Sequence, residues 1–365
     1  MDRRRMLLGM AALSLSGCAG GSVSVPAVLG ESEPDPLARF RFGADASADI
    51  WTQHLHVPTL RNAPQILALS AGAEDGAFGA GALCGLSNAN RRPDFDIVTG
   101  VSTGALIAPF AFLGPKYDDI LRRIFTDHEA DDIMHFSGIS AVSGNALYDT
   151  APLAQLIKTY TPDPLLDAVA RRHDAGGRLF VATSNLETSR AVVWNMGTIA
   201  KAKDYGLFRA ILRASGALPG LFSPVTIRFD TPNRVLRETH VDGGVHMQVL
   251  ATPKAAFSAP PRRSGGGHLY LLINNTLTPA PQVASATPLG ISQQALTAMT
   301  RASAATSVNT ARLLARRNDL AFSVASVSPD VGVVYDPSDR FSSEYMAALF
   351  QHGNKRAATS HLWEK

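Results

Sequence analysis

Residues 100–104 of this 365-residue chain place a serine between two glycines, in the order Gly-Val-Ser-Thr-Gly. The pentad follows a short apolar run, residues 95–99, and leads into the apolar stretch 105–108. A G-x-S-x-G motif between a strand and a helix is typical of a nucleophile elbow, in which a sharp turn exposes the serine hydroxyl. The glycines suit such a turn because they lack Cβ. The helix that follows would direct its positive end at an oxyanion formed at Ser102.

A small-residue loop lies about thirty residues upstream of this serine. Residues 65–70 (QILALS) predict a buried strand, which runs into residues 71–76 (AGAEDG) and then an apolar helix. Several backbone N–H groups in such a loop can converge on one point, which suits an anion or an oxyanion. The same kind of loop also binds phosphates, or simply permits close packing of helix and sheet.

A carboxylate ends a third segment, the extended run before Gly243 and Gly244. An Asp-Gly-Gly sequence is most often only a turn. However, a carboxylate within hydrogen-bond reach of a serine hydroxyl can act as its general base. Asp242 is therefore a candidate partner of Ser102.

The order of these segments resembles the patatin-like phospholipases, which are serine acyl hydrolases with a Ser–Asp dyad. Residues 214–225 (ASGALPGLFSPV) are similar to the family's A-S-x-A-x-P-x-x-F-x-P-V signature between the elbow and the D-G-[AG] turn. The resemblance spans about residues 66–245 and extends toward the helix before residue 318. It implies a lipid acyl hydrolase of the phospholipase A, lysophospholipase or esterase type.

Other segments indicate the fold independently of the resemblance. Residues 179–183 and 191–194 predict a strand pair, and residues 268–273 predict another core strand. Two irregular stretches, at 258–267 and 277–290, predict long surface loops or lids. The alternation of strands with helices favours the fold that the resemblance also implies, a three-layer α/β/α sandwich with a mainly parallel central sheet.

The resemblance assigns roles to individual residues of this sequence. Ser102 matches the nucleophile and Asp242 the general base, while the N–H groups of Gly72, Ala73 and Thr103 fall where the family binds the oxyanion. The glycines of the three motifs are Gly76, Gly100, Gly104, Gly243 and Gly244. The histidines have no metal-ligand spacing, so we expect neither a metal nor another cofactor.

The loop at residues 71–76 departs from the family's G-G-G-x-[RK]-G pattern. An alanine at position 73 keeps the N–H donor, provided that the position does not require a positive φ. Asp75 stands where the family has a basic residue, next to Glu74. Two carboxylates here would oppose a phosphate near the scissile ester. We therefore expect uncharged esters, or lipids whose phosphate lies away from the loop, to be better substrates than anionic phospholipids.

Two other interpretations remain open from the sequence. An α/β-hydrolase with a Ser-Asp-His triad also places serine first, and either His352 or His361 would then be its base. Alternatively, the changes at Ala71, Ala73 and Asp75 suit a lipid-anchored binding or scaffold protein that keeps a degenerate catalytic fold.

The first residues predict export and lipidation. Charged residues 2–5 precede an apolar core at 6–15 and the sequence LSGC at 15–18, which resembles a lipoprotein signal-peptidase box. This resemblance implies a signal peptide at 1–17 and a lipidated Cys18 followed by a flexible tether to residue 36. Because Ala19 is not aspartate, we expect anchoring in the outer membrane of a bacterial cell envelope.

Composition agrees with a single enzymatic domain behind this leader. The formal net charge is +3, and removal of the leader leaves +1, which argues against a nucleic-acid partner. The expected partners are instead membrane lipids or acyl esters as substrate, and the membrane through the anchor. We expect the acyl hydrolase domain at residues 60–325, with a C-terminal extension at 326–365 packed on it. Once Cys18 is lipidated, Cys84 has no disulfide partner and is expected to be buried.

Overall fold

The structure of the protein, a computed structural model, describes residues 34–55, 63–136, 146–231, 234–251, 266–278, 288–329, 331–333, 335–336 and 339–364. The predicted signal peptide, Cys18 and almost all of the tether lie outside the described residues. Most of the two irregular stretches at 258–267 and 277–290 also lies outside them.

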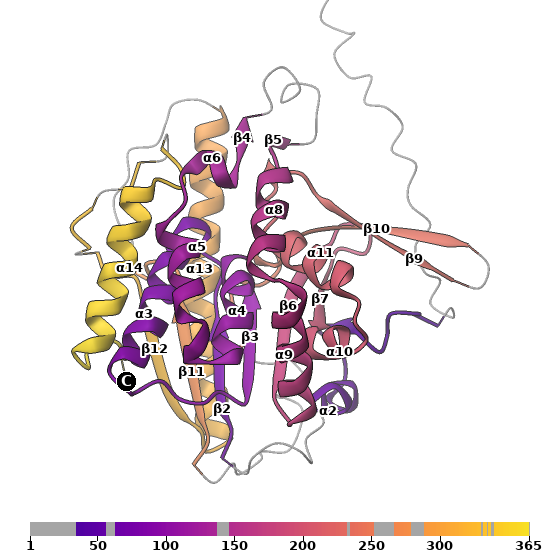
Figure 1. The fold of residues 1–365 in the computed structure, drawn as a ribbon, viewed down its shortest axis with the longest axis horizontal. Helices are drawn as coiled ribbons and strands as arrows, with labels where there is room; N and C mark the ends of the chain where they lie inside the picture. Colours follow the sequence, from indigo (N-terminus) through magenta and orange to yellow (C-terminus); the bar gives the residue numbers. More distant parts are fainter. Residues whose placement is uncertain are drawn as a thin grey trace, which may run out of the picture.

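Within these ranges a sheet of nine strands forms the centre of the molecule (Figure 1). Its middle strands are parallel to one another, which is usual for a sheet whose two faces are both covered by helices. In spatial order they are β6 (Arg178–Asn185), β3 (Ile97–Val101), β2 (Gln65–Leu69), β11 (His268–Ile273) and β12 (Ala321–Ser326). The strands predicted at 65–70 and 268–273 are confirmed.

Antiparallel strands extend the sheet beyond β6. They are β7 (Arg190–Asn195), β1 (Arg41–Gly43), β10 (Val235–Asp242) and β9 (Val225–Asp230), with β10 pairing both β6 and β9. The strand pair predicted from residues 179–183 and 191–194 is the antiparallel pair of β6 and β7. The sequence did not predict the small second sheet, which consists of β4 (His135–Phe136), β5 (Ala146–Asp149) and β8 (Gly220–Phe222).

The two faces of the central sheet bury different helices, because successive strand residues point in opposite directions. Leu67 and Leu69 of β2 face one core, whereas Ala68 between them faces the other. The first core contains α3 (Gly76–Asn88), α4 (Thr103–Leu113), α9 (Asp163–Asp174), α10 (Met196–Lys201), α11 (Tyr205–Ser215) and α14 (Ser343–Ala358). The opposite face packs against α13 (Pro288–Arg317) and α2 (Ala48–Leu55). The predicted three-layer α/β/α sandwich is therefore confirmed (Figure 1).

Three further helices lie on the side of the sheet that carries α4: α5 (Asp118–Thr126), α6 (Ala130–Ile133) and α8 (Ala151–Tyr160). α4 itself is apolar along almost its whole length, as expected of a helix enclosed on all sides. None of the described helices is both long and apolar enough to cross a membrane.

Small residues on α3 let the C-terminal helix α14 approach closely. A Cβ on Gly81 would lie 2.0 Å from the carbonyl oxygen of Phe350, and one on Gly85 would lie 2.4 Å from that of Asn354. Cys84 of α3 is buried beside this contact, and burial raises the pKa of its thiol to about 12. The C-terminal region therefore packs directly on the helix that follows the small-residue loop.

Candidate active site

Ser102 occupies the sharp turn between β3 and α4. Its φ of 57° and ψ of −126° are unusual for a residue with a side chain, and such strain is characteristic of functional turns. The Ser102 N–H donates to Ser215 Oγ at 2.9 Å, and that hydroxyl donates to the carbonyl oxygen of Ala182 at 2.7 Å. This chain of hydrogen bonds ties the turn to α11 and β6.

The motif glycines are required by close approaches between segments rather than by flexibility. A Cβ at any of them would lie less than 3.0 Å from another atom, either of a neighbouring element or of the same motif. The nearest atoms to an added Cβ are Gly104 O for Gly100 (2.4 Å), Leu69 O for Gly104 (2.6 Å), Thr103 Oγ1 for Gly76 (2.0 Å), Ala182 O for Gly243 (2.5 Å) and Asp242 Oδ1 for Gly244 (2.9 Å). These contacts press the elbow, the small-residue loop and the Asp-Gly-Gly turn together.

The structure brings Ser102 and Asp242 into direct contact. Ser102 Oγ donates to Asp242 Oδ2 at 2.5 Å, and the N–H of Gly244 donates to Oδ1 of the same carboxylate at 2.6 Å. Asp242 is the last residue of β10 and pairs with Thr183 of β6. β6 in turn lies next to β3, the strand that leads into the elbow. Sheet order therefore places this carboxylate beside the carboxyl end of β3.

Burial controls the acidity of Asp242, which is 2% exposed. Desolvation raises the pKa of its carboxyl to about 7, while the hydrogen bonds from Ser102 and Gly244 act in the opposite direction. A carboxylate with a pKa near neutrality can accept a proton and return it during one catalytic cycle.

The oxyanion residues predicted from the sequence divide into two groups. Ala73 and Thr103 line a pocket beside Ser102, and Thr103 begins α4, so the positive end of that helix is directed at the site. Gly72 is not among the described residues that line the pocket. Instead it packs against the residue that follows β11, where an added Cβ would lie 1.9 Å from the carbonyl oxygen of Asn274.

Alanine replaces glycine without strain only where φ is not positive, and Ala73 does not meet this condition. Its φ is 48°, in the left-handed region that costs a residue with a Cβ about 1–2 kcal/mol. The N–H donor is retained, but the loop carries strain at the residue that faces the pocket.

The expected pair of free carboxylates at the loop is not found. Glu74 does line the pocket, but Arg340 binds both of its oxygens, at 3.0 and 2.7 Å. Asp75 accepts a hydrogen bond from the Tyr345 hydroxyl of α14 at 2.8 Å and is not among the described pocket residues. The charge argument against phosphate near the ester therefore fails, because the sequence did not reveal a cation supplied from the C-terminal region.

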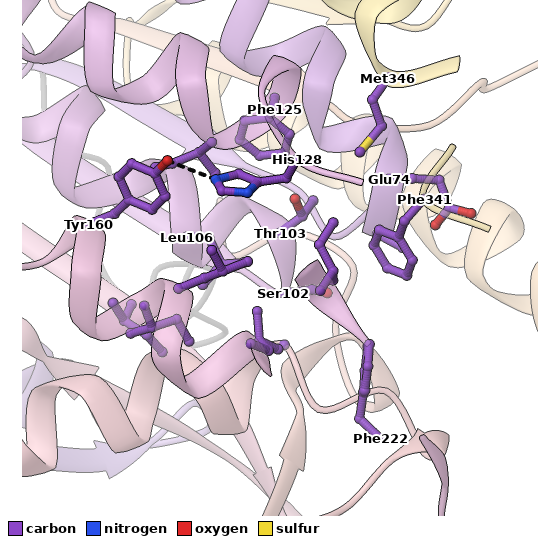
Figure 2. A pocket seen from close by; sticks show the side chains of 18 of the residues that line it. Glu74, Ser102, Thr103, Leu106, Phe125, His128, Tyr160, Phe222, Phe341 and Met346 are labelled. Carbon is purple, nitrogen blue, oxygen red and sulfur yellow. Dashed lines mark hydrogen bonds between the residues drawn. The ribbon is translucent and has the colours of Figure 1, made fainter. Parts of the chain in front are cut away.

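The pocket beside Ser102 is largely apolar (Figure 2). Its walls come from α4, α5, α8, α11 and the C-terminal region, and they include Leu106, Phe110, Phe125, Ile157, Leu212 and Phe341. His128 and Tyr160 form a polar pair in the lining and point toward each other, with 2.7 Å between His128 Nε2 and the Tyr160 hydroxyl. A cavity of this character suits an aliphatic chain attached to a group that reacts at Ser102.

The histidines of the alternative triad lie elsewhere. His352 on α14 packs against Phe78, and neither it nor His361 is among the described residues that line the pocket. His240 and His246, which flank the Asp-Gly-Gly turn, bond Thr183 and Ser184 respectively. No group of three or more His, Cys, Asp or Glu side chains that could hold a metal ion occurs in the described part of the chain.

Sequence reasoning missed two residues that shape this site. Ser215 was visible within the signature at 214–225, but its bond to Ser102 could not be read from it. Arg340 had no local signal at all, because its partner Glu74 lies 266 positions away.

Comparison with known proteins assigns the chain to a family. A family model described as patatin-like phospholipase matches residues 67–253. No curated protein sequence matches the chain.

Two solved structures are similar over 82% of this chain. The crystal structure of VipD from Legionella pneumophila has 11% identity and a TM-score of 0.33, with 67% of that chain covered. The type III effector protein ExoU has 14% identity and a TM-score of 0.23, with 53% of that chain covered. Likenesses this low say nothing about substrate or mechanism.

The family match covers just over half of the chain, including the small-residue loop, the elbow and the Asp-Gly-Gly turn. The protein belongs to the patatin-like phospholipase family of lipid-hydrolysing enzymes.

Proposed function

We propose that the protein hydrolyses lipid acyl esters with Ser102 as nucleophile and Asp242 as general base. Asp242 takes the hydroxyl proton while Ser102 Oγ forms a bond to the ester carbonyl carbon. The N–H groups of Ala73 and Thr103, together with that of Gly72, stabilise the negative charge that develops on the carbonyl oxygen. Collapse of this intermediate breaks the ester bond, and the leaving alcohol receives the proton from Asp242.

The second half of the cycle repeats this chemistry with water. The acyl group is then bound to Ser102 Oγ as an ester, and its chain lies in the apolar pocket. Asp242 takes a proton from a water molecule as the water oxygen attacks the acyl carbon. Release of the fatty acid returns the proton to Ser102, so one ester and one water give one acid and one alcohol.

The observation that carries this proposal is the 2.5 Å hydrogen bond between Ser102 and Asp242, at the edge of an apolar pocket. A direct contact between nucleophile and carboxylate removes the need for a histidine between them. The rival triad finds less support, because neither His352 nor His361 lines the pocket in the described part of the chain.

The proposal includes a lipid anchor at Cys18 that holds the enzyme at the bacterial cell envelope, in the outer membrane. Its support is the sequence at residues 15–18 and the charged and apolar segments before it. Metabolic labelling with radioactive palmitate should mark the wild-type chain but not the Cys18→Ala variant. Equal labelling of both chains would refute lipidation at this residue.

A fluorophosphonate probe and an activated short-chain ester test the catalytic proposal together. The probe should label Ser102 in the folded full-length protein, and Ser102→Ala and Asp242→Asn should each lower the rate by several orders of magnitude. His352→Ala and His361→Ala should keep wild-type rates. If one of these two variants is inactive while Asp242→Asn is active, the dyad is wrong and the triad is favoured.

The same probe separates an enzyme from a scaffold. The scaffold alternative is motivated by the replacements at Ala71, Ala73 and Asp75, and the strain at Ala73 is in keeping with it. A folded wild-type protein whose Ser102 is not labelled, and which releases no fatty acid from any lipid offered, would favour the scaffold.

A further inference from the structure

Arg340 lies far outside the residues matched by the family model, yet it lines the pocket beside Ser102. Its Nε donates to Glu74 Oε1 at 3.0 Å and its Nη2 to Glu74 Oε2 at 2.7 Å. This bidentate geometry fixes the orientation of a carboxylate as well as its position. Glu74 is 3% exposed, so the pair is largely shielded from water and from salt.

A second contact from the same region holds the neighbouring residue. The Tyr345 hydroxyl donates to Asp75 Oδ1 at 2.8 Å, and burial, together with the nearby Asp75 carboxylate, raises the pKa of the Tyr345 hydroxyl. Two consecutive carboxylates of the loop are therefore attached to the C-terminal region, one to Arg340 before α14 and the other to Tyr345 within α14. The attachment joins parts of the chain that are 266 and 270 positions apart.

The residue before Glu74 needs such support. Ala73 has a φ of 48°, and a strained conformation persists only where the surrounding structure determines it. Ala73 also lines the pocket next to Ser102 and Thr103, and the proposed function uses its N–H as an oxyanion donor. The backbone of Ala73 is thus positioned by its neighbour Glu74, because Arg340 holds the Glu74 side chain in a fixed orientation.

We infer that Arg340 is a positioning residue for the oxyanion loop, acting through Glu74 on the N–H of Ala73. This inference rests on the proposed function. A carbonyl oxygen becomes an oxyanion only in the transition state, so a displaced donor weakens transition-state binding more than substrate binding. Loss of the pair therefore lowers kcat and leaves KM nearly unchanged.

The test is the double variant Glu74→Gln/Arg340→Met, in which no buried charge is left without a partner. Its substrate is a water-soluble acetate ester, whose short acyl group does not depend on the pocket walls. We expect kcat to fall about 10- to 100-fold and KM to change less than about twofold, since loss of an oxyanion donor costs about 10²–10³ in kcat. Arg340→Lys keeps the charge but cannot form the bidentate pair, so it should show a smaller fall in kcat.

The matched control is the double variant Arg92→Met/Asp118→Asn, which removes another ion pair and likewise leaves neither charge without its partner. Arg92 Nη1 is 2.5 Å from Asp118 Oδ1, and neither residue is among the described pocket residues. This variant should lower Tm while keeping the wild-type kcat. A comparable fall in Tm without a fall in kcat would show that destabilisation alone does not slow the reaction.

The outcomes distinguish this inference from the proposed function. If the double variant folds and its kcat is within about twofold of wild type, the positioning role is overturned. If the double variant does not fold, the same result with a folded Arg340→Lys overturns it. A rise in KM with unchanged kcat also overturns it, because Arg340 would then contribute to substrate binding. If Ser102→Ala hydrolyses the ester as fast as wild type, the proposed function itself is wrong.

Discussion

The hydroxyl of Ser102 and the carboxylate of Asp242 share a hydrogen bond of 2.5 Å, although 140 positions separate the two residues. The carboxylate is enclosed, and the N–H of Gly244 also donates to it, at 2.6 Å. The contact makes the protonation state of one buried acid decisive for both reactivity and stability.

Activity should rise with pH to a plateau above about pH 7. Burial raises the pKa of Asp242 to about 7, and only the ionised form can accept the Ser102 proton. Below that value kcat/KM should fall about tenfold per pH unit, measured with a neutral short-chain ester between pH 5 and 9. Inactivation by a fluorophosphonate should follow the same curve, and an inflection near pH 4 in both would contradict this assignment.

Asp242→Asn should stabilise the fold at alkaline pH while abolishing activity. A carboxyl whose pKa is raised on folding binds its proton more tightly in the native state, so its contribution to stability is lost as pH rises from about 4 to 7. Asparagine carries no charge at any pH. We expect the variant to exceed wild type by about 1–3 kcal/mol in unfolding free energy at pH 8 and to match it near pH 4.

Denaturant titrations at the two pH values measure this difference. Asp119→Asn is the control, because Asp119 is exposed on α5 and its replacement should give no pH-dependent gain. A variant at Asp242 that is equally destabilised at both pH values would show that the buried charge is not costly.

Ala73→Gly should stabilise the protein, which is the opposite of the usual effect of glycine. Relief of the left-handed strain at φ 48° outweighs the added entropy of the unfolded chain, for a net gain of about 0.5–1 kcal/mol. Ala71 lies two residues earlier and has no positive φ, so Ala71→Gly should destabilise the protein by a similar amount. Thermal unfolding of the two variants measures the sign of each change in stability. If Ala73→Gly is less stable than wild type, the left-handed conformation of Ala73 is not strained.

Ser215→Ala should slow catalysis as well as weaken the fold. It removes the acceptor of the Ser102 N–H and the donor to Ala182 O, and leaves two buried backbone groups unpaired. We expect a loss of about 2–4 kcal/mol in unfolding free energy and a fall of about tenfold in kcat as the turn shifts. Thr99→Val removes a similarly buried hydroxyl, which donates to Leu250 O at 2.6 Å, and should cost stability without lowering kcat.

Leu106→Trp should shorten the acyl chain that the enzyme accepts. Leu106 lines the apolar pocket on α4, and a larger side chain there occupies the space of the distal chain (Figure 2). We expect kcat/KM for a long-chain ester to fall roughly 10- to 100-fold relative to the acetate ester, since a filled pocket excludes the chain by about 1–3 kcal/mol. Leu313→Trp, at a 62% exposed position of α13, should leave the chain-length profile unchanged.

Local patterns in the sequence were sufficient for the elements that carry the site. Residues 95–108 have the apolar run, glycine turn and apolar helix that β3, Ser102 and α4 adopt. The largely apolar runs at 65–70 and 268–273 predicted core strands, and the alternation of strands with helices predicted a mainly parallel sheet. The family resemblance rested on the same local segments.

Relationships between distant residues were decided by the tertiary structure alone. The pairing of Glu74 with Arg340 and the contact of Asp75 with Tyr345 depend on how the C-terminal region folds against the loop, and the positive φ of Ala73 has no local signal in the sequence. The expectation of two free carboxylates at the loop was wrong for this reason. Spacing along a strand or helix fixes the face on which a side chain lies, whereas its charge environment and backbone strain depend on whichever segment folds against that face.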